Sequence, residues 1–436
     1  MTAFLLAAAL AAQQPDLRDA GAVNRLLALL RTADPAVCEM AGRTLTNQWG
    51  WGSGVADEPM PTPMPVPMPM PFGGGPGISG PNVSRPAGMA LDARVLALFR
   101  TALRDQSRCV GRIAARIVAR EQPTWAASEF GALTKDADPG LREIGLLGLG
   151  ELEDPRTTGM MTNALGDPDA NVRGMAAWAL GQLEDTEAIT PLGKALGDES
   201  PLVRRRAVRA LGEIEDDAAL THLERALRDR DASVRRTAAW AMGEIESAKA
   251  VPMLRTALAD SDPDVRRTAI WAVGEIEDAS GVDVLAPLVK DGDARIRRMA
   301  AWALGEIESG RAVSVLASAV RDNDRDVKLT ALWALGQIED GAGVEVVAPA
   351  LKDQDADVRQ MAAWALGQIE DSTAVGSLTP MLKDPDTDVR VVAAWALGQI
   401  ESGSALPALE AAKDDRSPVV RRAVQWAIRQ IDDDRR

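Results

Sequence analysis

The sequence has no tyrosine, four phenylalanines and a single histidine, His222, among its 436 residues. Its two cysteines, Cys38 and Cys109, have no further Cys or His residues near them at metal-ligand spacing, so we expect no metal site. A nucleophile elbow and a glycine-rich phosphate loop are also missing. These absences indicate that the chain is not an enzyme, and we expect no cofactor and no small-molecule substrate.

Acidic residues outnumber basic ones, with 64 Asp and Glu against 49 Lys and Arg, for a net charge of −15. Because an acidic surface repels phosphate backbones, we do not expect nucleic acid as a partner. A protein or a peptide is the expected class of partner.

Residues 1–14, MTAFLLAAALAAQQ, form an apolar run that ends in small residues. Such a run is typical of a secretory signal peptide, although the basic residues that usually precede it are missing. A signal peptide would imply an extracytoplasmic location, either periplasmic or secreted. The alternative is the apolar start of a first helix in a cytoplasmic protein. The run is too short to span a bilayer, and no other segment is apolar enough, so no membrane span is expected.

Tryptophan recurs along the chain at a fixed spacing of 31 residues, with one gap that Arg209 fills. The series consists of Trp178, Trp240, Trp271, Trp302, Trp333, Trp364, Trp395 and Trp426. A constant period of this size is typical of stacked-repeat proteins.

A Val-Arg pair, such as Val265-Arg266, marks the same point in each repeat. Three residues before the valine stands Asp or Ser, as at Asp262, and these residues favour the N-cap of a helix. A proline follows in three repeats, as at Pro263, which suits the first helical position. The pattern therefore predicts a second helix that starts here and ends near the Ile-Glu pair, preceded by a first helix such as residues 250–258.

The repeat SDPDVRRTAIWAVGEIE at residues 261–277 resembles the short HEAT-like repeats named after phycocyanobilin lyase subunits. Their pattern is D-P-x-V-R-x-x-A-A-x-A-L-G-x-I, and it matches well from residue 136 to the C-terminus and weakly over residues 16–121. The resemblance implies an all-α, right-handed α-solenoid of about twelve helix-turn-helix repeats with a binding or scaffolding role. A few members attach or detach bilins, so bilin lyase-like activity is a remote alternative.

The chain divides into five segments. They are a possible signal peptide (1–14), a degenerate N-terminal repeat (15–46), a Pro/Met/Gly-rich insertion (47–91), degenerate repeats (92–153) and regular HEAT-like repeats (154–436). Alternating Pro and Met at residues 59–72 exclude a helix in the insertion. We expect a surface loop there, or an arm that recruits a partner or lies on the tryptophans.

An acid and a base recur at one turn of each repeat, with Asp five residues before the marker valine and Arg or Lys one residue after it. This spacing suggests a ladder of Asp–Arg pairs between repeats that fixes their stacking. Its candidate members are Asp260, Arg266, Asp291, Arg297, Asp353 and Arg359.

On a helical wheel, Trp178 lies about 150° from the apolar stripe that contains Val172 and Leu180. The tryptophans therefore lie on the outward side of the second helix, which lines the concave surface in the family that the chain resembles. They either bind a partner together with flanking charged residues, or cover small residues of the neighbouring repeat. The candidate binding residues are Trp178, Trp240, Trp271, Trp302, Trp333, Trp364, Trp395, Arg236, Arg267, Arg298, Glu244, Glu275 and Glu306.

Two functions remain open at this point: a protein-binding scaffold or adaptor, and a structural or regulatory spacer of a bacterial envelope system. The cysteines offer one further site, because Cys38 and Cys109 both fall at the start of a second helix in adjacent repeats. A disulfide between them would clamp the end of the solenoid if the chain is exported. Equivalent positions of stacked helices lie about 8–10 Å apart, which is too far for a bond without local adjustment.

Overall fold

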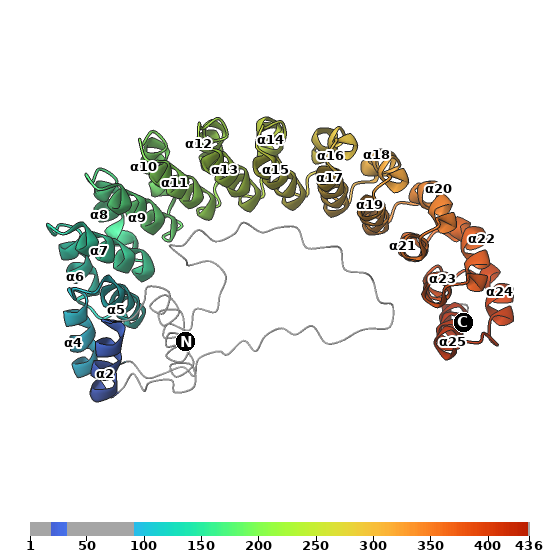
Figure 1. The fold of residues 1–436 in the computed structure, drawn as a ribbon, viewed down its shortest axis with the longest axis horizontal. Coiled ribbons are helices and arrows are strands. Elements are labelled where there is room, and N and C mark those ends of the chain that lie inside the picture. Colours follow the sequence, from blue (N-terminus) through green and yellow to red (C-terminus); the bar gives the residue numbers. More distant parts are fainter. Residues whose placement is uncertain (1–18, 33–90, 435–436) are drawn as a thin grey trace. The chain divides into compact units, whose positions relative to one another are not determined.

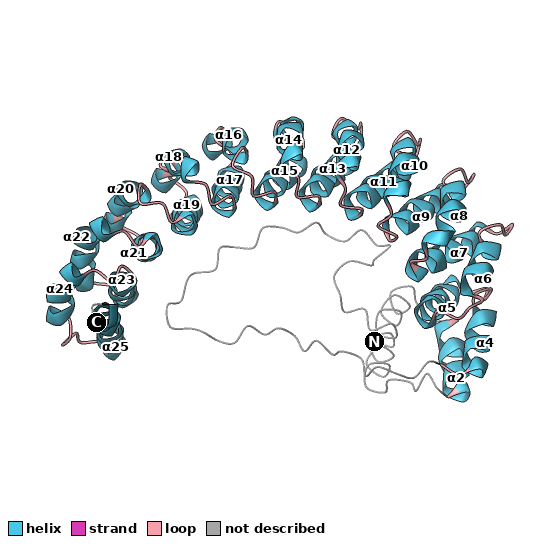
Figure 2. Ribbon diagram, turned by 180° about the vertical axis from the view of Figure 1, so that it is seen from behind, coloured by secondary structure: helices cyan, strands magenta, loops and turns pink. Residues whose placement is uncertain are grey.

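The computed structural model describes residues 19–32 and 91–434, and within these ranges every regular element is a helix (Figure 2). The predicted all-α solenoid is confirmed. Residues 1–14, Cys38 and all but the last residue of the insertion lie outside the described residues. The signal peptide, the disulfide and the five segment boundaries therefore stay predictions.

The described helices form two compact units, and the boundary between them falls inside one helix, between Ala241 and Met242. The first unit contains α2 (Ala20–Leu30), α4 (Ala93–Ala102), α5 (Arg108–Glu121), α6 (Ala126–Leu133), α7 (Pro139–Leu152), α8 (Thr158–Ala164), α9 (Ala170–Gly181), α10 (Ile189–Ala195), α11 (Pro201–Glu213), α12 (Leu220–Ala226) and most of α13 (Ala232–Glu244). The second contains α14 (Val251–Leu258), α15 (Pro263–Glu275), α16 (Gly281–Leu285), α17 (Ala294–Glu306), α18 (Val313–Leu316), α19 (Arg325–Ile338), α20 (Gly343–Val347), α21 (Ala356–Ile369), α22 (Val375–Leu378), α23 (Thr387–Gln399), α24 (Leu406–Ala411) and α25 (Pro418–Asp434).

Each repeat is a pair of helices, and the pair α14/α15 shows how the sequence specifies it. The side chain of Asp262 accepts hydrogen bonds from the backbone amides of Asp264 and Val265, so it caps α15 as the sequence predicts. The two helices then bury their apolar stripes against each other, with Leu254 and Val265 fully buried between them. Successive pairs stack so that the second helices of each unit form one layer.

This layer of second helices lies on the concave side of each unit and is called the inner layer below (Figure 1). The first helices form the outer layer, and in the second unit four of them are short. There α16, α18, α20 and α22 are each followed by a 3₁₀ helix: η5 (Leu288–Lys290), η7 (Ala319–Arg321), η8 (Ala348–Lys352) and η10 (Thr379–Lys383). Three of these breaks coincide with a proline, such as Pro287, which has no amide hydrogen to continue the α-helical pattern.

A glutamate with a left-handed backbone ends the second helix in nine successive repeats, with φ between 49° and 54°. The column consists of Glu153, Glu184, Glu215, Glu246, Glu277, Glu308, Glu339, Glu370 and Glu401. Glycine is the usual residue at such a helix end, because it has no Cβ to strain the conformation. The helix end near the Ile-Glu pair was predicted, but the left-handed glutamate was not.

Candidate partner-binding surface

The inner layer positions one tryptophan in most repeats, and none of these side chains projects freely. Trp178, Trp271 and Trp364 are buried, with 6%, 9% and 9% of their surface exposed. Trp240, Trp302, Trp333, Trp395 and Trp426 are half-buried. The column therefore offers indole edges to a partner rather than whole rings.

A glycine in the preceding repeat receives each of these rings except that of Trp240, since the nearest atoms to a Cβ on Gly212 belong to Ala241. A Cβ atom added to Gly305 would lie 2.8 Å from Cζ3 of Trp333 and 2.9 Å from the Cα atom of Ala334. The same Gly–Trp contact recurs at Gly150/Trp178, Gly243/Trp271, Gly274/Trp302, Gly336/Trp364, Gly367/Trp395 and Gly398/Trp426. The six-membered ring thus fills the space of a missing side chain, which fixes the indole in place and packs the repeats together.

Charged side chains flank the tryptophans at the start of the second unit. Arg267 pairs with Asp264, and Arg298 Nη1 lies 3.7 Å from Asp326 Oδ2. Burial raises the pKa of Glu275, as do the carboxylates of Glu246 and Glu277, while a hydrogen bond from the Trp271 indole lowers it.

Glu306 is in the same situation. Its pKa is raised by burial and by Glu275 and Glu277, and it accepts a hydrogen bond from Trp302. Glu244, the third predicted acid, ends α13 and is half-buried. The acids beside the first tryptophans of the second unit therefore repel one another.

Further along the second unit the flanks of the column become neutral. Gln337, Gln368 and Gln399 replace the acids, all three half-buried. Leu329 and Val391 replace the arginines and are buried. The two positions that flank the tryptophan, one turn before and one turn after it, are therefore charged on α15 and α17 and uncharged on α19, α21 and α23, a change that the sequence columns already contain.

The gap in the tryptophan series has its own structure in the first unit. The guanidinium carbon of Arg209 lies 5.4 Å from the ring centroid of Trp240, and its Nε donates a 3.0 Å hydrogen bond to Glu213. A Cβ atom on Gly181 would meet Glu213, which therefore fills the place that a tryptophan fills elsewhere. Burial raises the pKa of Glu213, against the opposing effect of Arg209. Sequence reasoning missed this cluster, whose signals were the break in the period and the i, i+4 spacing of Arg209 and Glu213.

The predicted ladder residues lie at the turns before the second helices. Arg297 donates two hydrogen bonds to the carboxylate of Asp322 in the next repeat, from Nε at 2.7 Å and from Nη2 at 2.8 Å. Its Nη1 donates to the backbone carbonyl oxygen of Asp291. Lys328 Nζ reaches Asp353 at 2.6 Å. Pairs of this kind also join Arg142–Asp167, Arg173–Asp198, Arg204–Asp229, Arg359–Asp384 and Arg390–Asp415.

Arg266 is the exception among the candidates. Its Nη1 donates to the carbonyl oxygens of Asp260 and Ser261, at 2.8 and 3.2 Å, but it forms no ion pair with Asp291. Asp291 instead accepts from the backbone amide of Asp293. Nothing in the sequence distinguishes this step of the ladder from the others.

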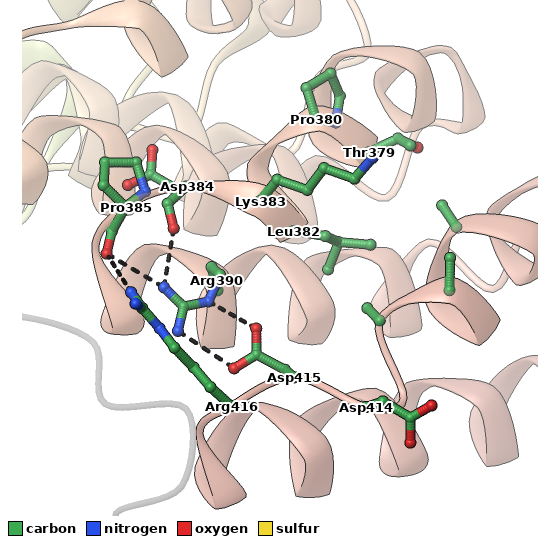
Figure 3. A pocket seen from close by; sticks show the side chains of 13 residues that line it. Thr379, Pro380, Leu382, Lys383, Asp384, Pro385, Arg390, Asp414, Asp415 and Arg416 are labelled. Carbon is green, nitrogen blue, oxygen red and sulfur yellow. Dashed lines mark hydrogen bonds and ion pairs between the residues drawn. The ribbon is translucent and has the colours of Figure 1, made fainter.

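A cavity of about 850 Å³ lies at the outer end of one ladder step, between η10 and α24 (Figure 3). Its polar groups are largely paired: Arg390 Nε donates to Asp415 at 3.0 Å, and Arg416 donates to the carbonyl oxygen of Pro385 at 3.4 Å. Leu382 and Ala408 contribute to its apolar lining. The paired groups assign this cavity to the packing of repeats, away from the tryptophan column.

Within residues 19–32 and 91–434, no three His, Cys, Asp or Glu side chains gather as metal ligands would. In the same part of the chain, no helix combines the length and apolar character that a membrane crossing requires. His222 lies on α12 next to Gly193 of the preceding repeat.

A family model of HEAT repeats matches the chain seven times, at residues 127–200, 160–232, 189–262, 224–299, 252–336, 287–353 and 344–429. No curated protein sequence matches the chain.

Several solved structures share the fold. The crystal structure of Kap121p is 14% identical with a TM-score of 0.56, and the match covers 95% of this chain and 49% of that one. Kap95p, in a structure that concerns its binding to RanGDP, is 15% identical with a TM-score of 0.57 and coverages of 99% and 64%. Importin beta is 14% identical with a TM-score of 0.55 and coverages of 94% and 57%.

The chain thus spans about half to two thirds of the length of these three proteins, and at such identity the likeness shows the fold alone. The repeat matches, by contrast, extend over most of the chain, from residue 127 to residue 429. The chain belongs to the HEAT repeat family.

Proposed function

We propose that this chain is a protein-binding scaffold whose inner layer contacts the partner through the tryptophan column. The observation that carries the proposal is the repeated Gly–Trp contact. An indole held against the preceding repeat has already lost its rotational freedom, so little conformational entropy remains to be lost on binding. Tryptophan and arginine are also the residues that contribute most at protein interfaces.

The polar flanks support a protein partner in particular. Arg298, Glu306 and Gln337 are half-buried beside Trp302 and Trp333, where their side chains remain accessible for hydrogen bonds. Such a surface, aromatic at its centre and polar at its edges, has the composition of a protein interface. Kap95p, which shares the solenoid fold, binds RanGDP, and binding of a protein by a solenoid is the mode of action proposed here.

The test compares inner-layer variants with an outer-layer control. Chemical crosslinking first identifies the partner, and the purified partner is then titrated by calorimetry. Trp302→Leu combined with Trp333→Leu should weaken binding about tenfold or more. A control with Arg255→Gln and Glu345→Gln, both exposed in the outer layer, should stay within about twofold.

The leucine variants also lose packing over their glycines, so a second variant separates the two effects. Glu306→Gln combined with Gln337→Ala changes half-buried polar groups and leaves the Gly–Trp contacts in place. It should weaken partner binding while the far-UV circular dichroism and the melting temperature stay near those of the wild type. Unchanged affinity in both inner-layer variants would refute the scaffold proposal.

A structural or regulatory spacer of an envelope system is the second candidate, and the close Gly–Trp packing favours it. In that case the leucine variant should lower the melting temperature and leave every partner interaction unchanged. Export is part of this alternative and rests on residues 1–14, so mass spectrometry of the mature N-terminus tests it. The resemblance to phycocyanobilin-lyase-type repeats leaves a lyase-like activity as a remote proposal, which a bilin-transfer assay checks.

A further inference from the structure

We infer that the break in the tryptophan column is a subsite for a carboxylate, supplied by an acidic segment of the protein partner. Arg209 and Arg236, on either side of Trp240, receive the carboxylate. The inference rests on the proposed function and names the chemistry of the partner at one place.

The first observation is a local excess of positive charge in a chain whose net charge is −15. Helix α11 contains four arginines within six residues, Arg204 to Arg206 and Arg209, and only Arg204 belongs to the ladder, through Asp229. Arg236 adds a further cation on α13. The acids near this region are Glu213, which Arg209 pairs, the exposed Glu184, and the half-buried Glu244 one turn after Trp240 on α13.

The second observation is the state of Arg209. Its Nε is bonded to Glu213, its one ion-pair partner among the described residues, whereas its two terminal nitrogens form no hydrogen bond with any of them. The guanidinium stacks over Trp240, which fixes its plane, and 30% of the side chain is exposed. A planar guanidinium with two free donors is the geometry that binds a carboxylate through paired hydrogen bonds.

The third observation concerns Arg236, which lies four residues before Trp240 and so on the same helix face. Its Nε is the one buried side-chain nitrogen or oxygen, among the described residues, that has no hydrogen-bond partner. Buried donors in folded proteins are almost always paired. The side chain as a whole is half-buried, and its terminal nitrogens also form no hydrogen bond or ion pair with a described residue. These terminal nitrogens are the donors that an acceptor from outside the chain would bind.

The α15 repeat shows what the acceptor is. Arg267 occupies the position of Arg236 two helices later, and it pairs with Asp264 three residues before it. The corresponding residue before Arg236 is Ser233, whose hydroxyl donates to Asp231 instead. The carboxylate that the α15 repeat supplies internally is therefore missing at α13, and the partner's carboxylate takes its place.

The experiment uses the full chain and fluorescence anisotropy of a short fluorescein-labelled peptide of glutamate and serine. Arg209→Trp, which restores the repeated residue, and Arg236→Gln should each weaken binding about tenfold, as the loss of a charge-assisted contact does. Ser233→Asp supplies a carboxylate from within the chain and should weaken binding of the peptide by about the same factor as the two arginine variants. The control Arg255→Gln, which removes an exposed arginine of the outer layer, should stay within about twofold.

The affinity for the acidic peptide should fall as the salt concentration rises. It should also be higher than the affinity for a lysine–serine peptide, although the net negative charge of the chain favours the opposite order. Equal affinity of wild type and Ser233→Asp, or preference for the lysine peptide, would overturn the inference. Binding of inorganic phosphate in place of the carboxylate peptide would also overturn it. The tryptophan variants above test the scaffold separately, because they leave Arg209, Arg236 and Ser233 unchanged.

Discussion

Adding one methyl group at Gly305 is expected to destabilise the second unit, although alanine is the better helix former. Gly305 lies near the end of α17, beneath the indole of Trp333. The new Cβ atom would lie 2.8 Å from Trp333 Cζ3 and 2.9 Å from both Cα and Cβ of Ala334. All three distances are below ordinary van der Waals contact, and one of the atoms belongs to the backbone of α19.

The magnitude follows from two opposing effects. Alanine in place of glycine inside a helix stabilises by about 0.5–1 kcal/mol. Overpacking of a well-filled core costs about 1–3 kcal/mol, because side chains and backbone must shift. Since the Cα atom of Ala334 moves only if α19 moves, we expect the second effect to prevail and Gly305→Ala to lose about 1–2 kcal/mol net.

The control is Gly376→Ala in α22 of the same unit, where an added Cβ meets nothing within 4 Å. It should leave stability unchanged or raise it by up to about 1 kcal/mol. Urea unfolding followed by far-UV circular dichroism measures both variants. A Gly305→Ala protein as stable as Gly376→Ala would refute the Gly–Trp packing argument. In a Trp333→Leu background, Gly305→Ala should cost less stability than in the wild type, but not nothing, because the contacts with Ala334 remain.

Three further predictions concern charge. The double variant Glu275→Gln/Glu306→Gln should raise the free energy of unfolding at pH 7 by about 0.2–0.5 kcal/mol per site. The pKa of each acid is raised, which means that its ionised form destabilises the fold. The gain, measured by thermal melts, should therefore vanish as the pH falls below about 4. Arg297→Ala should lower the free energy of unfolding, measured in urea at pH 7, by about 1–3 kcal/mol. Because the hydrogen bond from Arg297 lowers the pKa of Asp322, the difference in stability between wild type and variant should shrink as the pH falls below about 4. Lys328→Arg should raise the melting temperature, because a guanidinium can bond the aspartate through two nitrogens where the ammonium uses one.

The helix pairs could be predicted from the sequence because their signals are local. Asp262 caps α15 through amides two and three residues away, and Pro263 occupies the next position, so both act within one turn. Repetition of the same signals at a constant spacing then defined the register of the whole series. The all-helical fold required no knowledge of contacts between repeats.

The candidate site was less predictable, because its contacts join different repeats. A helical wheel gives the direction of Trp333 relative to its own helix, but not that its ring lies over Gly305 of the preceding one. The same limit explains Arg209, which the sequence presents only as a missing tryptophan. Its stacking on Trp240 depends on the distance between α11 and α13, which local spacing does not contain, whereas its bond to Glu213 is an i, i+4 contact within α11.

Positions that vary between repeats are where partner recognition is best sought. The Gly–Trp contacts and the Asp–Arg pairs recur at most stacking steps, and a residue that most steps share does little to distinguish one repeat from another. The flanking positions do change, from Arg298 to Leu329 and from Glu306 to Gln337, while α17 and α19 start at the same position of the repeat and end within one residue of each other. Stacking therefore tolerates these changes, and the order of charged and neutral flanks is free to match a partner. Ser233 belongs to this variable class, so changing it to Asp alters recognition without removing a contact on which stacking depends.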